Sequence, residues 1–150
     1  MISVAFSLLR LMIVASNRVS VIKFPKIQDI RGNLTFIESD GHIPFEIKRV
    51  YWINDVPGGV FRGSHALKET EEVLIALSGS FDVNIFDGEI EKKYQLNRSY
   101  EGLIIPKMIW RYLDNFSTNA VCLVISSQHY NSDDYIRDKD KYIRIINGKE

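Results

Sequence analysis

Cysteine is almost absent from this chain, with a single residue, Cys122, among 150. It lies inside the apolar run of residues 120–125, where a free thiol behaves as a small hydrophobic side chain. One cysteine excludes an intrachain disulfide framework, which suits a reducing compartment such as the cytoplasm.

An excess of charge of either sign is also lacking, because 19 basic residues face 19 acidic ones. Such a chain has no overall field that would attract nucleic acid or an anionic membrane. We therefore expect no nucleic-acid partner, and any ligand must be recognised by a local site. The length fits one domain.

A hydrophobic run long enough to span a membrane is missing as well. Residues 1–16 are largely apolar, but Arg10 interrupts them. A spanning helix needs about 20 apolar residues, and an export signal carries its positive charge ahead of the apolar stretch. We interpret residues 1–18 as an extension of uncertain role, with a true start at Met12 as one alternative and a targeting segment as another. Residues 19–150 are expected to form a cytoplasmic domain without a membrane partner.

The chain is rich in short β-branched and aromatic runs separated by turn residues, and this pattern predicts an all-β fold. The expected strands cover residues 19–24, 34–38, 47–54, 71–78, 80–86, 89–95, 102–105, 109–115 and 120–126. Asp87-Gly88, between two alternating runs, is the strongest hairpin signal. Many short strands at this spacing favour a double-sheet jelly roll. The tail over residues 132–142 is expected to form a short helix or ordered arm.

Residues 62–68 read Arg-Gly-Ser-His-Ala-Leu-Lys and are the most informative stretch. Gly59, His65, Glu72 and Gly79 match the first cupin pattern in register. A second cupin segment is echoed by residues 102–115, but its histidine is missing and Arg111 lies nearby. A metal centre of the ordinary cupin kind needs about three imidazoles and a carboxylate. The chain has only three histidines, and the other two lie beside a turn and near the tail, so we expect no metal.

Five segments together resemble the WxcM-like sugar-nucleotide 3,4-ketoisomerase family. They begin at Ile43, Arg62, Val73, Gly102 and Asp134, and read IPFxIKRVY, RGxHAxK, VLIALSGS, GLIIPxxxW and DYIR. The resemblance spans about residues 21–142, nearly the whole chain. Their ordered occurrence in one chain is far more specific than any one of them alone.

The resemblance implies a metal-free cupin homodimer, without cofactor, that acts on dTDP-4-keto-6-deoxy-D-glucose in deoxyamino-sugar biosynthesis for surface polysaccharide. It moves the keto group from C4 to C3 through an enediolate. Such chemistry needs a base, an acid, and a cation that faces the developing oxyanion. We assign His65 as the base because histidine titrates near neutral pH, Arg62 as the cation, and Tyr51 as a proton donor or relay.

Further contacts with the substrate are expected from five residues: Arg62, Lys68, Glu72, Trp110 and Arg111. Trp110 and Arg111 are adjacent, so at most one of the two lines a pocket. Tyr51 and Trp52 alternate in the same way, and we expect Tyr51 to face the site because its hydroxyl has a role there.

The chain departs from the family at one position, because the family motif reads His-Ala-His and the second histidine is replaced by Leu67. Positions 65 and 67 of a strand point to the same face, so this leucine would make one wall of the site apolar. Three interpretations remain open. His65 works alone with Tyr51 as its relay; the enzyme acts as an isomerase or epimerase on another nucleotide sugar; or the protein binds a dTDP-sugar without turnover.

Overall fold

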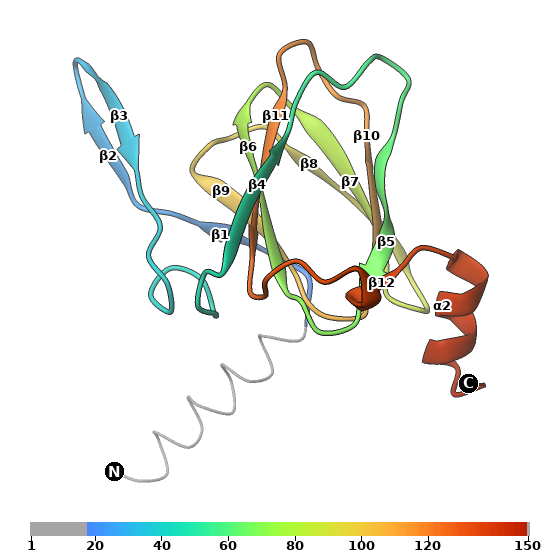
Figure 1. The fold of residues 1–150 in the computed structure, drawn as a ribbon. Coiled ribbons are helices and arrows are strands. Elements are labelled where there is room, and N and C mark those ends of the chain that lie inside the picture. The colour runs from blue at the N-terminus through green and yellow to red at the C-terminus, as the bar shows by residue number, and fades with distance from the viewer. Residues whose placement is uncertain (1–17, 150) are drawn as a thin grey trace, which may run out of the picture.

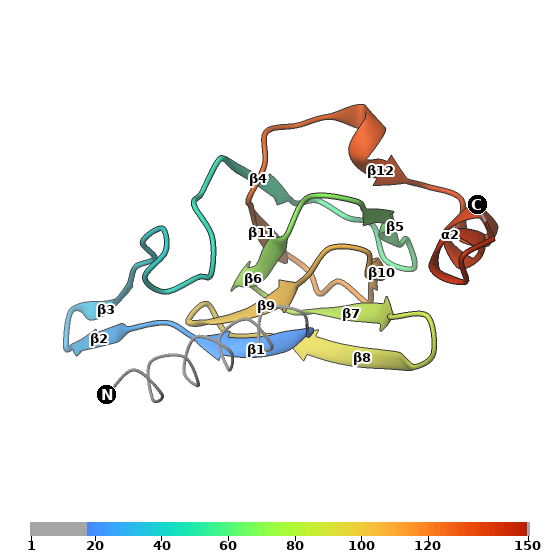
Figure 2. The same cartoon turned by 90° about the horizontal axis from the view of Figure 1, so that it is seen from below.

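The structure is a computed structural model that describes residues 18–149, so the predictions for the N-terminal extension fall, Arg18 aside, outside the described residues. Two sheets face each other, and a hairpin and one helix extend from them (Figures 1 and 2). The strands are β1 (Ser20–Lys23), β2 (Lys26–Asp29), β3 (Gly32–Thr35), β4 (Arg49–Ile53), β5 (Arg62–Leu67), β6 (Glu72–Ser78), β7 (Phe81–Phe86), β8 (Glu91–Leu96), β9 (Glu101–Ile105), β10 (Trp110–Asp114), β11 (Val121–Ser126) and β12 (Tyr135–Ile136). The helix is α2 (Lys139–Ile146).

All strand pairs are antiparallel, and the strand order crosses over between neighbours. One five-stranded sheet has the order β1-β9-β6-β11-β4, and the other has the order β12-β5-β10-β7-β8. The two sheets remain separate rather than closing into one barrel, and β2 pairs only with β3. This is the double-sheet jelly roll that the sequence predicts, and the fold class is confirmed.

The main core lies between the two sheets and is built from the inward side chains of alternating strands. Leu74 and Ala76 of β6 face Phe81 and Val83 of β7 in this cluster. A second cluster covers part of the outer face of the first sheet, where Phe45 packs with residues of β6, β9 and β11. Among residues 18–149, the outer face of that sheet is therefore only partly covered.

Three short strands, β2, β5 and β12, were not among the predicted ones. The residues of β5 include glycine, serine and histidine, which are not typical of strands, so local propensity gives no signal. Pairing with β10 on one side and β12 on the other makes this segment a strand.

The C-terminal arm begins with a 3₁₀ turn (Ser132–Asp134), continues through β12 and ends in α2. The helix starts later than predicted because Asp138 caps it, its carboxylate accepting a hydrogen bond from the backbone N–H of Lys141. The hydroxyl of Tyr142 donates to the carbonyls of Phe86 and Met108, at 3.1 and 2.9 Å, and fixes α2 against the second sheet. No helix within residues 18–149 has the length and hydrophobicity needed to cross a bilayer.

Candidate active site

A buried carboxylate, Glu72 on β6, holds together side chains from both sheets. The Tyr51 hydroxyl donates to its Oε1 atom at 2.9 Å, and the Ser126 hydroxyl donates to the same atom at 3.2 Å. Arg111 of β10 binds the other oxygen, Oε2. Glu72 and Arg111 are each only 2% exposed, so this is a fully buried ion pair with its remaining acceptor positions occupied.

Positive charge exceeds negative charge around this carboxylate. Arg49 lies two residues before Tyr51 on β4, on the same face, and its Nη2 atom is 3.9 Å from Oε1 of Glu72. Its guanidinium also lies 5.3 Å from the centre of the Tyr51 ring. With Arg111, two guanidinium groups share one carboxylate, so the cluster carries a net positive charge that favours an anionic ligand.

His65 faces this cluster from β5, because it lies directly opposite Arg111 in the β5–β10 ladder. Its Nε2 atom is buried and has no hydrogen-bond partner among the described residues. Burial, and the positive charges of Arg111, Arg137 and Arg49, lower the pKa of His65 to about 2. The imidazole is therefore neutral at pH 7, and a nitrogen is left without a partner.

A β-bulge before His65 sets the position of its ring. Residue 65 lies opposite residue 111, but residue 62 lies opposite 113, so β5 has one extra residue in this interval. Gly63 supplies it with a φ of +69°, and a Cβ there would lie 3.7 Å from Cε1 of His65. The positive φ favours glycine at this position and so allows the bulge, whereas a Cβ would make only an ordinary van der Waals contact with the imidazole.

Tyr135 of β12 completes the group of side chains around His65. The centres of the two rings are 4.9 Å apart, and Nη2 of Arg49 donates to the Tyr135 hydroxyl at 3.4 Å. Arg137 lies over the Tyr135 ring, 4.3 Å from its centre. In the β12–β5 ladder, Tyr135 lies directly opposite Leu67, which is buried.

Asp134 anchors the segment that carries Tyr135. Its carboxylate accepts hydrogen bonds from the backbone N–H of Glu69, at 2.6 Å, and from the hydroxyl of Thr70. The backbone N–H of Lys68 donates to the Asp134 carbonyl at 3.0 Å. The C-terminal arm is therefore tied to the β5–β6 connection beside the site.

The structure brings together four of the predicted site residues, namely His65, Tyr51, Glu72 and Arg111. As expected, Tyr51 faces inward, and Trp52 is 64% exposed. Glu72 is not a rim carboxylate but the buried centre of the cluster.

The other three predicted residues lie elsewhere. Arg62 is exposed and lines a hollow of about 270 Å³ beside Trp52. Lys68 is exposed, and its ammonium donates to the carbonyl of Asp133 at 2.9 Å. Trp110 is on the opposite face of β10 from Arg111 and packs with Tyr142 of α2, with ring centres 5.6 Å apart. It is a core residue of the helix contact and does not reach the cluster.

Four residues of the cluster were not predicted as site residues: Arg49, Ser126, Tyr135 and Arg137. The sequence did carry a signal for Arg49, because it lies two residues before Tyr51 on a predicted strand and therefore shares its face. Tyr135 lies in the DYIR segment of the family resemblance, but no role was assigned to it, and it reaches His65 through the pairing of β12 with β5.

The histidines and carboxylates of the described residues do not form a metal site. Within residues 18–149, no three His, Cys, Asp or Glu residues converge as a metal site. His42 lies away from the strands, against Phe36, with ring centres 5.1 Å apart, and its Nδ1 atom accepts from the backbone N–H of Glu38. His65 is thus the histidine of this cluster.

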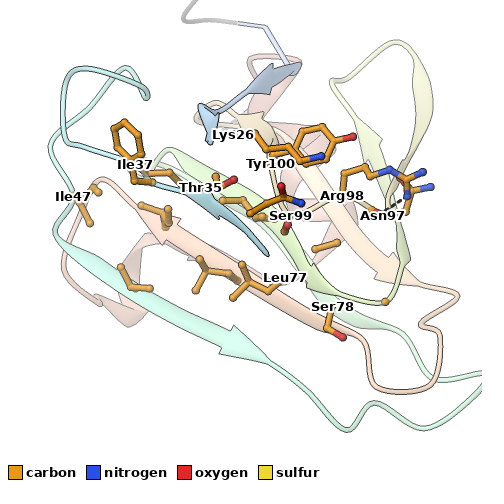
Figure 3. Close-up of a pocket in the computed structure, with 18 residues that line it drawn as sticks. Lys26, Thr35, Ile37, Ile47, Leu77, Ser78, Asn97, Arg98, Ser99 and Tyr100 are labelled. Carbon is orange, nitrogen blue, oxygen red and sulfur yellow. Dashed lines mark hydrogen bonds between the residues drawn. The ribbon is translucent and has the colours of Figure 1, made fainter. Parts of the chain in front are cut away.

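A separate hollow of about 700 Å³ lies on the outer face of the first sheet, between that sheet and the β2–β3 hairpin (Figure 3). Lys26 and Thr35 of the hairpin border it, as do Leu77 of β6 and Tyr100 before β9. None of the residues of the His65 cluster lines it.

Comparison with known proteins gives a consistent result. The profile of the family described as FdtA, WxcM-like, C-terminal, matches residues 17–147. A TDP-4-oxo-6-deoxy-alpha-D-glucose-3,4-oxoisomerase from Aneurinibacillus thermoaerophilus is 44% identical over 130 residues, covering 85% of this chain and 94% of the relative.

Solved structures of 3,4-ketoisomerases are also similar to this chain. A 3,4-ketoisomerase from Helicobacter canadensis is 43% identical with a TM-score of 0.85, covering 87% of this chain and 98% of that one. A mutant of the 3,4-ketoisomerase QdtA from Thermoanaerobacterium thermosaccharolyticum, in complex with TDP-4-keto-6-deoxyglucose, is 40% identical with a TM-score of 0.85, covering 87% and 95%.

Proposed function

Because the chain belongs to the FdtA, WxcM-like family, we propose that it is a sugar-nucleotide 3,4-ketoisomerase that acts on dTDP-4-keto-6-deoxy-D-glucose. The relatives at 40–44% identity are named as isomerases of this kind, and one is bound to this keto sugar. We also propose that the reaction takes place in the cytoplasm and supplies a deoxyamino sugar for surface polysaccharide.

The observation that carries the proposal is the buried, unpartnered Nε2 atom of a neutral His65 beside two guanidinium groups. A keto–enediol isomerisation needs a free base next to a carbon acid, and a positive charge where the enediolate oxygen develops. The His65 cluster supplies both in one place.

In the proposed reaction His65 removes the proton from C3 of the sugar, and the electron pair of that C–H bond forms the C3–C4 double bond of an enediolate. The negative charge develops on O4 and is stabilised by the guanidinium groups of Arg49 and Arg111. The imidazolium of His65 then returns the proton to C4. Over the whole reaction one hydrogen moves from C3 to C4 and another from O3 to O4, so the product is an isomer of the substrate.

Substrate binding would also strengthen His65 as a base. In the free protein burial, together with the surrounding arginines, holds the pKa of His65 at about 2, far below the value that suits general base catalysis at neutral pH. The diphosphate brings two negative charges, which oppose the field of the arginines. We expect the pKa of His65 to rise when the nucleotide binds.

The remaining predicted residues have different roles in this proposal. Tyr51 donates to Glu72, and Glu72 in turn holds Arg111 in place on the buried side of the proposed sugar site. Arg62 and Lys68 stay predicted ligands of the diphosphate, since both are exposed cations. Trp110 is buried under α2 and is not part of the proposed substrate site.

We further propose that the protein is a homodimer formed through the β2–β3 hairpin and the outer face of the first sheet. The hairpin projects away from the sandwich in both views (Figures 1 and 2). Its apolar side chains Ile27 and Leu34 are each 56% exposed, and Val50 and Leu77 of the sheet are 47% and 49% exposed beside the hollow of Figure 3. A two-fold axis would place the hairpin of each copy on the sheet of the other and cover both patches.

Sedimentation velocity tests the dimer. Ile27→Asp should convert it to a monomer, because a charge would be buried in the interface. Ile90→Asp is the matched control, since Ile90 is similarly exposed, at 63%, but lies in the β7–β8 turn. A monomeric wild type, or an unchanged dimer in Ile27→Asp, would contradict this arrangement.

The isomerase proposal is tested by incubating the purified protein with dTDP-4-keto-6-deoxyglucose in heavy water and following the product by NMR. We expect a 3-keto product, with deuterium at C4 in those turnovers in which the imidazolium of His65 exchanges its proton with solvent before returning it. His65→Asn should lower kcat by at least about 10²-fold, the usual contribution of a general base, and leave nucleotide affinity unchanged. Binding without turnover or exchange would instead identify a non-catalytic dTDP-sugar-binding protein.

A further inference from the structure

In the proposed isomerase reaction, on which this inference rests, the replacement of the second family histidine by Leu67 leaves one of the two proton transfers without a side chain to carry it. His65 can carry the proton between C3 and C4, but a second proton must leave O3 and reach O4. Leucine can neither give nor accept a proton. Another side chain near His65 has to carry out this transfer.

We propose that the hydroxyl of Tyr135 carries the proton from O3 to O4, in place of the histidine that is absent at position 67. Tyr135 lies directly opposite Leu67 in the β12–β5 ladder, so it comes from the neighbouring strand to the same part of the site. Residues directly opposite each other in such a pair point to the same face of the sheet. The ring of Tyr135 also lies 4.9 Å from that of His65, between centres.

Two positive charges lie beside the side chain of Tyr135. Arg49 donates to this hydroxyl at 3.4 Å, and Arg137 lies 4.3 Å from the ring centre. Cations beside a phenol stabilise its ionised form. The phenolate that forms during the transfer would therefore have counter-charges already in place.

Tyr51, the other tyrosine near His65, is less suited to this role. Its hydroxyl already donates to the buried carboxylate of Glu72 at 2.9 Å. Burial and this negative charge raise the pKa of Tyr51 well above its usual value, so it gives up its proton less readily. Tyr51 is better placed to hold Glu72 than to relay a proton.

The position of Tyr135 is fixed by its neighbour in sequence. Asp134 is 9% exposed, and its carboxylate binds the backbone of Glu69 and the hydroxyl of Thr70 in the β5–β6 connection. Asp134 is thus a positioning residue. It holds the β12 segment at the distance from His65 that the proton transfer requires.

The proposed transfer balances in protons and charge. As His65 removes the C3 proton, negative charge develops on O4 of the enediolate. The Tyr135 O–H bond then breaks and its proton goes to O4, which leaves an enediol and a phenolate. As His65 returns a proton to C4, the phenolate removes the proton of the O3 hydroxyl, and the C3–O3 bond becomes the new ketone. Both residues return to their starting state, and no further reactant is needed.

The test is the turnover of Tyr135→Phe, alone and combined with Leu67→His. We expect Tyr135→Phe to lower kcat by about 10²-fold, the lower range for general acid–base catalysis, and to change KM by less than about threefold. In the double variant, Leu67→His should raise kcat at least about tenfold above that of Tyr135→Phe alone, because the new imidazole supplies a group for the same proton. Tyr130→Phe is the matched control, since that ring packs on Tyr135 but its residue is 63% exposed.

Folding is checked by circular dichroism, and Tyr135→His gives a second line of evidence because it keeps a group that transfers protons. It should retain more activity than Tyr135→Phe. If the wild type turns over and Tyr135→Phe has the same kcat, the role of Tyr135 is wrong but the isomerase function stands. The role of Tyr135 is also wrong if Tyr135→Phe loses kcat and neither the added Leu67→His nor the Tyr135→His variant shows a smaller loss. A wild type that binds the keto sugar without turnover would overturn the proposed function itself.

Discussion

Lowering the pH from 7 to 5 should destabilise this protein through His65 in particular. In the folded chain, burial and three neighbouring guanidinium groups hold the pKa of His65 at about 2. In the unfolded chain the same imidazole is expected to titrate with its ordinary pKa of about 6.5. Between these two values the unfolded state binds a proton that the folded state does not.

The sign and size of the effect follow from this difference in bound protons. Because the unfolded state binds more protons, the free energy of unfolding rises with pH, and the contribution of His65 is lost as the pH falls below about 6.5. Integrating a single group with pKa values of about 6.5 and about 2 gives a loss of about 2 kcal/mol between pH 7 and pH 5. Well below pH 6.5, the contribution of His65 to the free energy of unfolding falls by about 1.4 kcal/mol for each unit of pH.

Urea unfolding followed by circular dichroism measures this effect, with wild type compared with His65→Gln at the same protein concentration. Carboxylates titrate in both proteins, so the difference between them isolates His65. We expect the wild type to lose about 2 kcal/mol more than the variant between pH 7 and 5. Equal losses, or a smaller loss in the wild type, would refute the reasoning, because His65 would then be protonated in the folded protein.

Three further predictions concern the residues around the site. Glu72→Gln should lower the free energy of unfolding by about 3–5 kcal/mol, measured by urea unfolding, because it leaves the buried charge of Arg111 without its partner. Asp134→Asn should cost about 1–3 kcal/mol and reduce kcat, since a charged acceptor of two hydrogen bonds is lost. Trp110→Ala should cost about 3–5 kcal/mol in stability, and its KM, measured at a temperature where it is folded, should stay within about twofold of the wild type. A large rise in KM would show that Trp110 does contact the substrate.

The strands with β-branched or aromatic runs could be predicted from the sequence, and β6 and β10 match the expected ranges to within a residue or so. The jelly roll followed from their number and spacing. The strand that carries His65 could not be predicted from propensity, because its residues take a strand conformation only between β10 and β12. Its function was recognised through the family resemblance rather than through its local pattern.

Within the site, residues close to His65 in sequence were easier to name than those close to it in space. Arg62, three residues from His65, was predicted as the cation of the site because its guanidinium suits an oxyanion, yet it is exposed beside a different hollow. Tyr135 is 70 residues away in the sequence and 4.9 Å away between ring centres. Only the antiparallel pairing of β12 with β5 brings it there.

The arrangement of charges gives a physical reason why Leu67 is compatible with catalysis. A second imidazole at this position would lie in the same field of guanidinium groups that lowers the pKa of His65. It would stay neutral and lose its hydration on burial, which is unfavourable unless it finds a hydrogen-bond partner. Leucine avoids that cost, since it is apolar and fully buried. The phenol of Tyr135 can take over the proton because its hydroxyl can donate and because Arg49 and Arg137 lie beside it.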